Sequence, residues 1–125
     1  MPVCIVCIGS NYSRRENLPL ARCKLQALYP AIRFATEQDT VPLYFKNPAL
    51  FANQVALFET EQSKEAILGA LKQIERLAGR LPGDKQQEKV CLDIDLLCYD
   101  DEVLKPNDLK RMYVQDGLKE LQIER

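Results

Sequence analysis

Residues 89–99 form an apolar run with two aspartates in its middle, and this run constrains the fold more than any other stretch. Its residue types are typical of a buried β-strand. Because successive side chains of a strand point to opposite faces, Asp93 and Asp95 share one face, about 6–7 Å apart along the chain. The apolar side chains between and beside them point the other way, into a core: Leu92, Ile94 and Leu96.

Two like charges on one strand face repel each other and are costly to remove from water, so folding alone gives little reason for them. A divalent cation would supply the missing counter-charge, because Mg²⁺ is usually held by one or two carboxylates plus substrate phosphates. The alternative is a half-exposed strand whose acidic face is simply solvated. From this run alone, both interpretations of Asp93 and Asp95 stay open.

Composition limits the class of protein. The chain has 125 residues, of which 46% are hydrophobic and 28% charged, and its net charge of −1 gives no general attraction for nucleic acid or an anionic membrane. No apolar run approaches the roughly 20 residues of a transmembrane helix. The N-terminus lacks the basic segment of a signal peptide. We therefore expect one cytoplasmic domain over residues 1–125 that binds neither nucleic acid nor membrane.

The five cysteines and the absence of histidine limit the chemistry. Cys4, Cys7, Cys91 and Cys98 could be assembled on paper into a four-thiolate zinc site. Each pair, however, is separated by an odd number of positions within an expected strand, so its members face opposite sides. We expect buried cysteines that act as small hydrophobic residues. Without histidine, a mechanism that needs an imidazole base is excluded.

Apolar patterns elsewhere predict the remaining elements. Strands are expected at residues 3–8, 32–36 and 51–58, and helices at residues 63–78 and up to residue 29. The first helix begins at a capping box on Ser13 or at Asn17, and Ser63 caps the second. Residues 39–50 show no sustained period and predict an irregular loop. The buried stripe of the second helix is predicted as Ile67, Leu68, Leu71, Ile74, Leu77 and Ala78.

This βαββαβ order predicts an α+β fold, a ferredoxin-like sandwich with an antiparallel sheet and both helices on one face. The other face would be free to carry a site that includes Asp93 and Asp95. A last short helix, capped by Asn107 or Asp108, would bury two leucines further along, Leu118 and Leu121.

Two further positions are candidates for ligand contact. Gly9 ends the first strand and lets the backbone approach a ligand closely. Asn53 is a polar residue on an apolar strand face that it shares with Phe51, Val55 and Leu57. Asn53 either faces a ligand or satisfies backbone groups of the preceding loop, and its spacing favours the second interpretation.

Several stretches together resemble the 6-hydroxymethyl-7,8-dihydropterin pyrophosphokinase family of folate biosynthesis. In order, they are Ile8-Gly9-Ser10-Asn11, Thr40-Val41-Pro42-Leu43, Phe51 with Asn53, Ile74-Glu75, Gly79-Arg80, Leu92-Asp93-Ile94-Asp95-Leu96-Leu97 and Glu102-Val103-Leu104. The resemblance implies transfer of pyrophosphate from ATP to the hydroxymethyl group of a dihydropterin, with two Mg²⁺ ions. ATP and the dihydropterin are then the expected partners, and nothing specifies a protein partner.

The resemblance also implies roles for single residues. Asp93 and Asp95 would hold the metals between the ATP phosphates, and Arg80 and Lys89 would be catalytic cations. The pterin pocket would be lined by Thr40, Leu43, Phe51, Asn53 and Gly9. In that pocket, Phe51 would stack on the pterin ring and Asn53 would form hydrogen bonds with it.

The chain also departs from the family pattern. The family's Gly-Pro-Arg-like triplet before the Asp-x-Asp strand reads Glu88-Lys89-Val90 here, and lysine cannot reproduce arginine's bidentate grip on phosphate. The family's arginine-rich loop with its tryptophan keeps only Arg80 and Lys85. A nucleotide-contacting histidine aligns with Tyr113 and an arginine with Lys119, and the chain ends earlier than members usually do. These departures imply an alternative, a catalytically impaired pseudoenzyme or a pterin- or nucleotide-binding module.

Overall fold

The computed structural model describes residues 1–40, 51–79 and 90–122. Its elements, in chain order, are β1 (Val3–Ser10), α1 (Arg14–Leu28), β2 (Arg33–Phe34), β3 (Gln38–Thr40), β4 (Phe51–Glu59), α2 (Lys64–Leu77), β5 (Asp93–Tyr99), β6 (Glu102–Val103), α3 (Pro106–Leu109) and α4 (Met112–Glu120). The predicted strands at residues 3–8 and 51–58 and the helix at residues 63–78 are confirmed within one or two residues.

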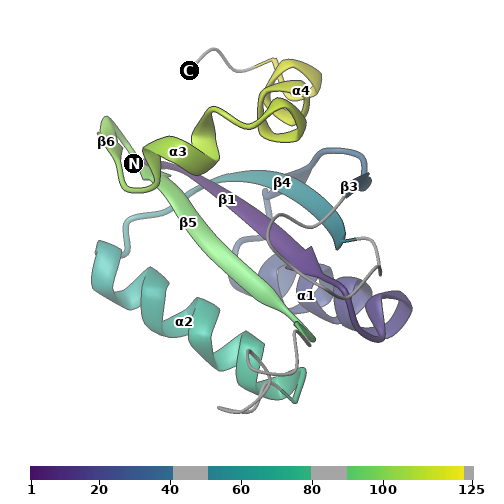
Figure 1. Ribbon diagram of the computed structural model, residues 1–125. Coiled ribbons are helices and arrows are strands. Elements are labelled where there is room, and N and C mark those ends of the chain that lie inside the picture. Colours follow the sequence, from purple (N-terminus) through teal and green to yellow (C-terminus); the bar gives the residue numbers. More distant parts are fainter. Residues whose placement is uncertain (41–50, 80–89, 123–125) are drawn as a thin grey trace.

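The strands form one antiparallel sheet in the order β2-β4-β1-β5-β6, with β3 paired to the end of β4. The helices α1 and α2 lie side by side against one face of this sheet (Figure 1). The long central strand β1 therefore has β4 on one side and β5 on the other. This arrangement confirms the predicted α+β ferredoxin-like fold.

The main core lies between this sheet face and the two helices. Alternate residues of β1 and β5 point into it, among them Val6, Ile8 and Ile94, and meet Leu25 of α1 and Leu71 of α2. All five side chains are at most 4% exposed. Every second residue of these strands and one face of each helix thus contribute side chains to the same apolar layer.

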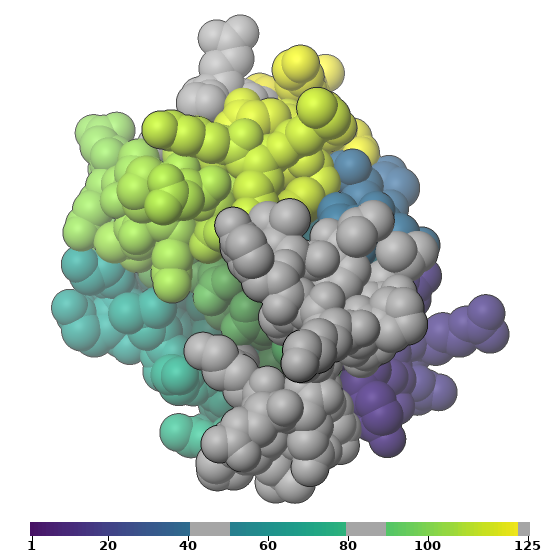
Figure 2. Space-filling view, in the orientation of Figure 1, coloured from purple at the N-terminus to yellow at the C-terminus, as the bar shows by residue number. Residues whose placement is uncertain are grey.

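The opposite sheet face is not free over its whole length, contrary to expectation. The short helices α3 and α4 cover part of it and form a second apolar cluster with Ile5, Val55 and Leu97 (Figure 1). Leu118 and Leu121 are buried there, as predicted. In the space-filling view, the atoms of the segment from β6 to α4 form one unbroken stretch of the molecular surface (Figure 2). This second layer explains why β1 is apolar on both faces.

Three of the buried cysteines belong to these two clusters, Cys4 to the first and Cys7 and Cys98 to the second. Cys4 points toward the α1–α2 layer, and Cys7 points toward the α3–α4 layer. Their placement on opposite faces of β1 confirms the prediction made from their spacing. Cys91 and Cys98 are also buried, whereas Cys23 on α1 is exposed.

A β-bulge interrupts the pairing of β1 with β5. Ile5 pairs with Cys98, but the next residue, Val6, pairs with Leu96, so Leu97 is an extra residue in β5. As a result, Leu97 and Cys98 both belong to the α3–α4 cluster. The bulge separates the part of β5 that carries the aspartates from the part that packs under α3.

The start of α1 confirms the predicted cap at Ser13 in position, but not the predicted capping-box bonding. Ser13 is the N-cap residue, but its φ is 46° and its side chain makes no capping hydrogen bond. Its carbonyl oxygen instead accepts from the N–H groups of Glu16 and Asn17, at 3.0 and 2.9 Å. The Asn17 Nδ2 donates to the Tyr12 carbonyl oxygen at 2.8 Å, which ties the helix back to the preceding turn. By contrast, α3 begins after Lys105, with Pro106 in its first turn, rather than at the predicted caps.

Two further predictions were partly wrong. Leu68 and Leu77 were assigned to the buried stripe of α2, but they are 42% and 56% exposed, and Glu75 is buried instead. The reason is that α2 lies beside the sheet edge at β5, so only a narrow stripe of the helix is covered (Figure 1). The predicted loop at residues 39–50 begins as strand β3, and its residues 41–50 lie outside the described part of the chain.

A close contact between α4 and the sheet gives a first testable prediction. A Cβ atom at Gly117 would lie 2.8 Å from Val55 Cβ, so Gly117→Ala should push α4 away from β4. We expect the free energy of unfolding to fall by about 1–3 kcal/mol in urea denaturation. The matched control is Gly69→Ala in α2, where the new Cβ would meet nothing within 4 Å. In the control, the free energy of unfolding should rise by up to about 1 kcal/mol. An equal fall in both variants would contradict this account.

Candidate functional site

The two aspartates lie on the sheet face predicted for them. Leu92, Ile94 and Leu96 are buried on the side of α1 and α2. Asp93 and Asp95 are half-buried on the opposite side. The alternation along β5 therefore confirms that the carboxylates share one face.

Cross-strand pairing brings three of the predicted residues into one row. Gly9 of β1 lies between Asp93 of β5 and Asn53 of β4, because it is the pairing partner of both. Two strand spacings of about 4.8 Å put Asp93 and Asn53 about 10 Å apart. Since Gly9 has no side chain, none of the three residues of this row fills the space between the carboxylate and the amide. The row therefore sets two polar side chains on either side of a glycine.

Asn53 is 7% exposed and lies beside Thr40, another predicted residue. Its Nδ2 donates to Thr40 Oγ1 at 2.6 Å, and Thr40 pairs with Phe51 across β3 and β4. Its Oδ1 is the atom closest to where a Cβ of Gly9 would stand, at 3.4 Å. Among the described residues the amide therefore bonds a side chain, and its oxygen lies toward Gly9. The loop backbone that Asn53 was predicted to satisfy lies at residues 41–50, outside the described residues, so that expectation stays a prediction.

Ser10 and Asn11, which follow Gly9, hold the chain that leads into β5. Ser10 Oγ donates to the Cys91 carbonyl oxygen at 2.7 Å. Asn11 exchanges two bonds with Val90: its Oδ1 accepts from the Val90 N–H at 2.6 Å, and its N–H donates to the Val90 carbonyl at 2.9 Å. The Gly-Ser-Asn turn therefore positions the start of the aspartate strand, a role that its sequence alone did not indicate.

The electrostatics of the pair favour a bound cation. The pKa of Asp95 is raised to about 7, chiefly by burial. The negative charge of Asp93 and a hydrogen bond with the Asp93 carboxyl raise it further, and so does the charge of Asp108. The Lys105 ammonium lowers this pKa. Both partners supply hard oxygen donors, which suit Mg²⁺. Within residues 1–40, 51–79 and 90–122, no group of three or more possible ligands forms a closed metal cage. The pair thus fits an open site that leaves coordination positions for a ligand.

A hollow of about 520 Å³ flanks the aspartates on the side of α2. Its charged lining consists of Lys64, Lys72, Glu75, Asp93, Asp95 and Lys105. Lys64 is ion-paired with Glu102 at 3.1 Å. This α2–β5 hollow combines a cationic rim with an apolar wall, as a phosphorylated ligand with an aromatic base would require.

Glu75 was not among the predicted site residues. It is 6% exposed, and its Oε2 accepts from the Ile94 N–H at 2.8 Å, between the two aspartates. A signal was present in the sequence: Glu75 follows Ile74 and lies four positions after Leu71, within the apolar stripe of α2. A carboxylate at such a position is unfavourable unless it has a hydrogen-bond partner.

Three of the predicted residues, Leu43, Arg80 and Lys89, lie outside the described residues, so their roles stay predictions. Tyr113 on α4 is half-buried near Cys7, and its pKa is raised to about 12, chiefly by burial. Lys119 is exposed on the same helix. Of these two aligned positions, Tyr113 is therefore near the floor of the site.

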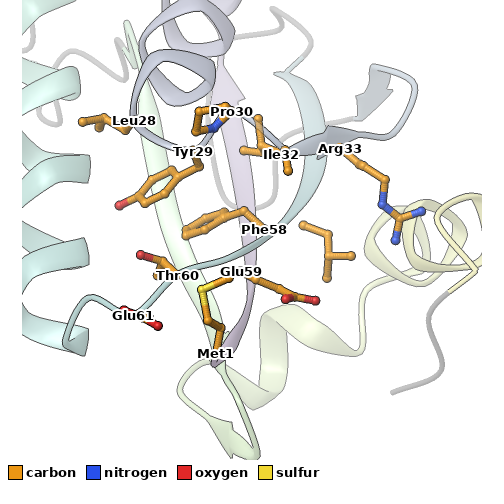
Figure 3. Close-up of a pocket in the computed structure, with 12 residues that line it drawn as sticks. Met1, Leu28, Tyr29, Pro30, Ile32, Arg33, Phe58, Glu59, Thr60 and Glu61 are labelled. Carbon is orange, nitrogen blue, oxygen red and sulfur yellow. The ribbon is translucent and has the colours of Figure 1, made fainter.

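A second hollow, of about 620 Å³, lies at the other end of β1 (Figure 3). Its wall includes the stacked rings of Tyr29 and Phe58, whose centroids are 3.9 Å apart, and the exposed side chain of Met1. The Arg33 guanidinium points away from these rings in Figure 3. This hollow lacks the convergent charged groups found at Asp93 and Asp95, and we do not assign it to the site.

The fold and the site together define a ferredoxin-like α+β protein with a carboxylate pair on an open sheet face. The sequence model of 7,8-dihydro-6-hydroxymethylpterin-pyrophosphokinase (HPPK) matches residues 5–123, so the chain belongs to this family. The family activity is the transfer of pyrophosphate from ATP to hydroxymethyldihydropterin in folate synthesis. No curated protein matches the chain. Among the helices of the described residues, none has the length and apolar character to cross a membrane.

The raised pKa of Asp95 predicts how stability depends on pH. The unfolded chain has an aspartate pKa of about 3.9, so the folded protein holds this proton more tightly, and the free energy of unfolding should fall as pH rises from about 4 to about 7. Asp95→Asn should remove this part of the dependence. Urea denaturation of both proteins in EDTA, at about pH 5 and about pH 8, measures the difference. Identical pH dependence in the two proteins would contradict the assignment.

Proposed function

We propose that this protein catalyses Mg²⁺-dependent pyrophosphate transfer from ATP to 6-hydroxymethyl-7,8-dihydropterin. The observation that carries the proposal is the row Asp93–Gly9–Asn53, which combines a carboxylate, a glycine and an amide on one sheet face. A metal ligand and a polar anchor for a heterocycle are what this reaction needs at close range. Family membership supports the same conclusion.

The nucleotide binds in the α2–β5 hollow. The cations Lys72 and Lys105 line it and supply positive charge next to the aspartates. A nucleotide base would rest against the apolar wall, which contains Leu68 and Leu104. The triphosphate would then extend toward Asp93 and Asp95.

The pterin binds on the other side of the aspartates, over Gly9. Asn53 Oδ1 accepts a hydrogen bond from a ring N–H, and Phe51 stacks on the ring. Thr40 fixes the Asn53 amide through the bond between Nδ2 and Oγ1. Leu43, outside the described residues, completes the pocket in this proposal. The hydroxymethyl group then lies toward the carboxylates.

The chemistry consists mainly of positioning and charge neutralisation. The hydroxymethyl oxygen attacks the β-phosphorus of ATP and releases its proton to water. The bond from the β-phosphorus to the oxygen that bridges it to the α-phosphorus breaks, and AMP leaves with that oxygen and the bonding electron pair. Bound Mg²⁺ ions supply charge neutralisation on the phosphates. Asp93 and Asp95 hold that charge at the junction of the two substrates, and Arg80 and Lys89 provide further cations.

A second candidate function is binding of the pterin or the nucleotide without turnover. The sequence favours it at one place: residues 88–90 lack the arginine of the family's triplet, and few arginines remain in the preceding loop. Calorimetric binding of Mg²⁺·ATP that depends on both aspartates, with no AMP formed, would support this candidate. Absence of both pterin and nucleotide binding would reject it.

Removal of either carboxylate tests the main proposal. Asp93→Asn and Asp95→Asn should each lower AMP formation by at least about a hundredfold, because each loses charge that faces the phosphates. The control is Asp101→Asn, an exposed position in the turn after β5, which should keep wild-type activity. The measurement is AMP release with saturating ATP, Mg²⁺ and dihydropterin. No AMP from the wild-type protein would refute the proposed activity.

The Thr40 hydroxyl provides a narrower test of the pterin side. Thr40→Val keeps the shape of the side chain but removes the partner of Asn53 Nδ2. Dihydropterin affinity, measured by calorimetry, should fall by about threefold to tenfold, the effect of one hydrogen bond. Affinity for Mg²⁺·ATP should not change. Thr60→Val is the control, since the Thr60 hydroxyl accepts from the nearby Gln62 N–H at 3.1 Å and is remote from Asn53. An equal loss in both variants would contradict the assignment.

A further inference from the structure

We infer that Glu75 is a positioning residue that holds the Asp93–Asp95 part of β5 in place from the neighbouring helix. The inference rests on the proposed function, because it concerns the carboxylates that the proposal assigns to the metal. It adds a role for a side chain of α2 that lines the α2–β5 hollow beside the aspartates and contacts their strand through the Ile94 backbone.

The contact is direct and buried. Glu75 lies in the last turn of α2 and is 6% exposed. Its Oε2 accepts from the Ile94 N–H at 2.8 Å. Ile94 is flanked by both aspartates, so this N–H belongs to the peptide unit that joins Asp93 to Ile94. Fixing this peptide unit fixes the direction in which the Asp93 side chain leaves the backbone.

The position of this bond in the sheet explains why it matters. On one side, β5 pairs with β1 through the whole acidic stretch, from Gly9–Asp93 to Val6–Leu96. On the other side, the pairing with β6 involves only Cys98 and Tyr99 among the described residues. Within the part of the chain that the structure describes, the acidic stretch therefore lies at an edge of the sheet, and the Glu75 carboxylate accepts the Ile94 N–H as a carbonyl of a further strand would.

Packing alone does not account for a carboxylate here. Glu75 occupies the buried stripe of α2 beside Ile74 and Leu71, where an apolar side chain would suit the core. A buried carboxylate loses its hydration, which is costly. The bond from the Ile94 N–H offsets part of this cost. It also ties α2 to the strand edge between the two aspartates.

Glu75 acts through the strand rather than as a ligand itself. Its carboxylate accepts from the backbone of Ile94, whose side chain points to the helices, whereas the two aspartates point to the opposite face. Substituting Glu75 should therefore loosen the spacing of the aspartates and weaken cation binding, while the pterin site at Asn53, two strands away, keeps its affinity.

The test compares three substitutions that differ in one property each. Glu75→Gln keeps an oxygen acceptor of the same reach, Glu75→Leu removes the acceptor at similar size, and Glu75→Asp keeps the charge but shortens the reach. Glu65→Gln, at an exposed position in the first turn of the same helix, is the control. Three quantities are measured: hydrogen exchange of the Ile94 amide by NMR, Mn²⁺ binding in the presence of ATP by electron paramagnetic resonance, and dihydropterin binding by calorimetry.

We expect the Leu and Asp variants to bind Mn²⁺ about tenfold or more weakly, as when the support of a metal ligand is removed. Their Ile94 amides should exchange faster than in the wild type, and their pterin affinity should stay within about twofold. The Gln variant and the Glu65→Gln control should resemble the wild type in all three measurements. If Glu75→Gln keeps wild-type Mn²⁺ affinity and Glu75→Asp does not, the role depends on the length and the acceptor oxygen of the side chain rather than on its charge.

Wild-type Mn²⁺ affinity in a folded Leu variant would overturn the inference. If the Leu variant does not fold, the Asp variant decides in the same way. Loss of pterin affinity equal to the loss of Mn²⁺ affinity would also overturn it, because that result indicates general destabilisation. None of these measurements needs turnover. A wild-type protein that binds Mn²⁺ and ATP but forms no AMP therefore rejects the proposed function and leaves the role of Glu75 intact.

Discussion

The alternation of side chains along β5 is the constraint on which the rest of the structure depends. One strand must contribute Leu92, Ile94 and Leu96 to the core and at the same time keep Asp93 and Asp95 out of it. A two-residue period achieves both, provided that the strand cannot rotate or slip. Pairing with β1, the ties from Ser10 and Asn11, and the contact from α2 all act on this strand. Much of the polar bonding around the site therefore serves to fix one register.

The surroundings of the carboxylates determine where their counter-charge must come from. Asp95 pairs across the sheet with Cys7, whose own pKa is raised to about 12 by burial and by the two aspartates, so the thiol is neutral. The floor on that side belongs to the apolar cluster under α3 and α4. In the described part of the chain, Lys72 and Lys105 of the α2–β5 hollow bring positive charge beside the pair, and Arg111 lies near Cys7 on the α3–α4 side.

The sequence predicted well what depends on local period and on paired charge. The alternation in β5, the helix α2 with its Ser63 cap, and the burial of Leu118 were all readable from spacing. What could not be read depends on contacts between distant segments. The helices α3 and α4 cover the sheet only because α4 approaches Val55 closely at Gly117. Strand β3 forms because Thr40 pairs with Phe51 of β4. For the same reason the bond from Glu75 to Ile94, 19 positions apart, was missed. A buried carboxylate within an apolar stripe was its only local sign.

The bulge at Leu97 has a consequence for how this strand tolerates changes in length. Without Leu97, Cys98 would follow Leu96 directly, and the ladder with Ile5 and Val6 would run on unbroken while Asp93 and Asp95 kept their partners. Loss of Ile94 instead would turn one aspartate toward the helices. Deletion of Leu97 should therefore leave the pairing of both aspartates intact, whereas deletion of Ile94, three positions earlier, should disrupt it. Because of the bulge, the C-terminal part of β5 can change in length without altering the register of its N-terminal part, which carries Asp93 and Asp95.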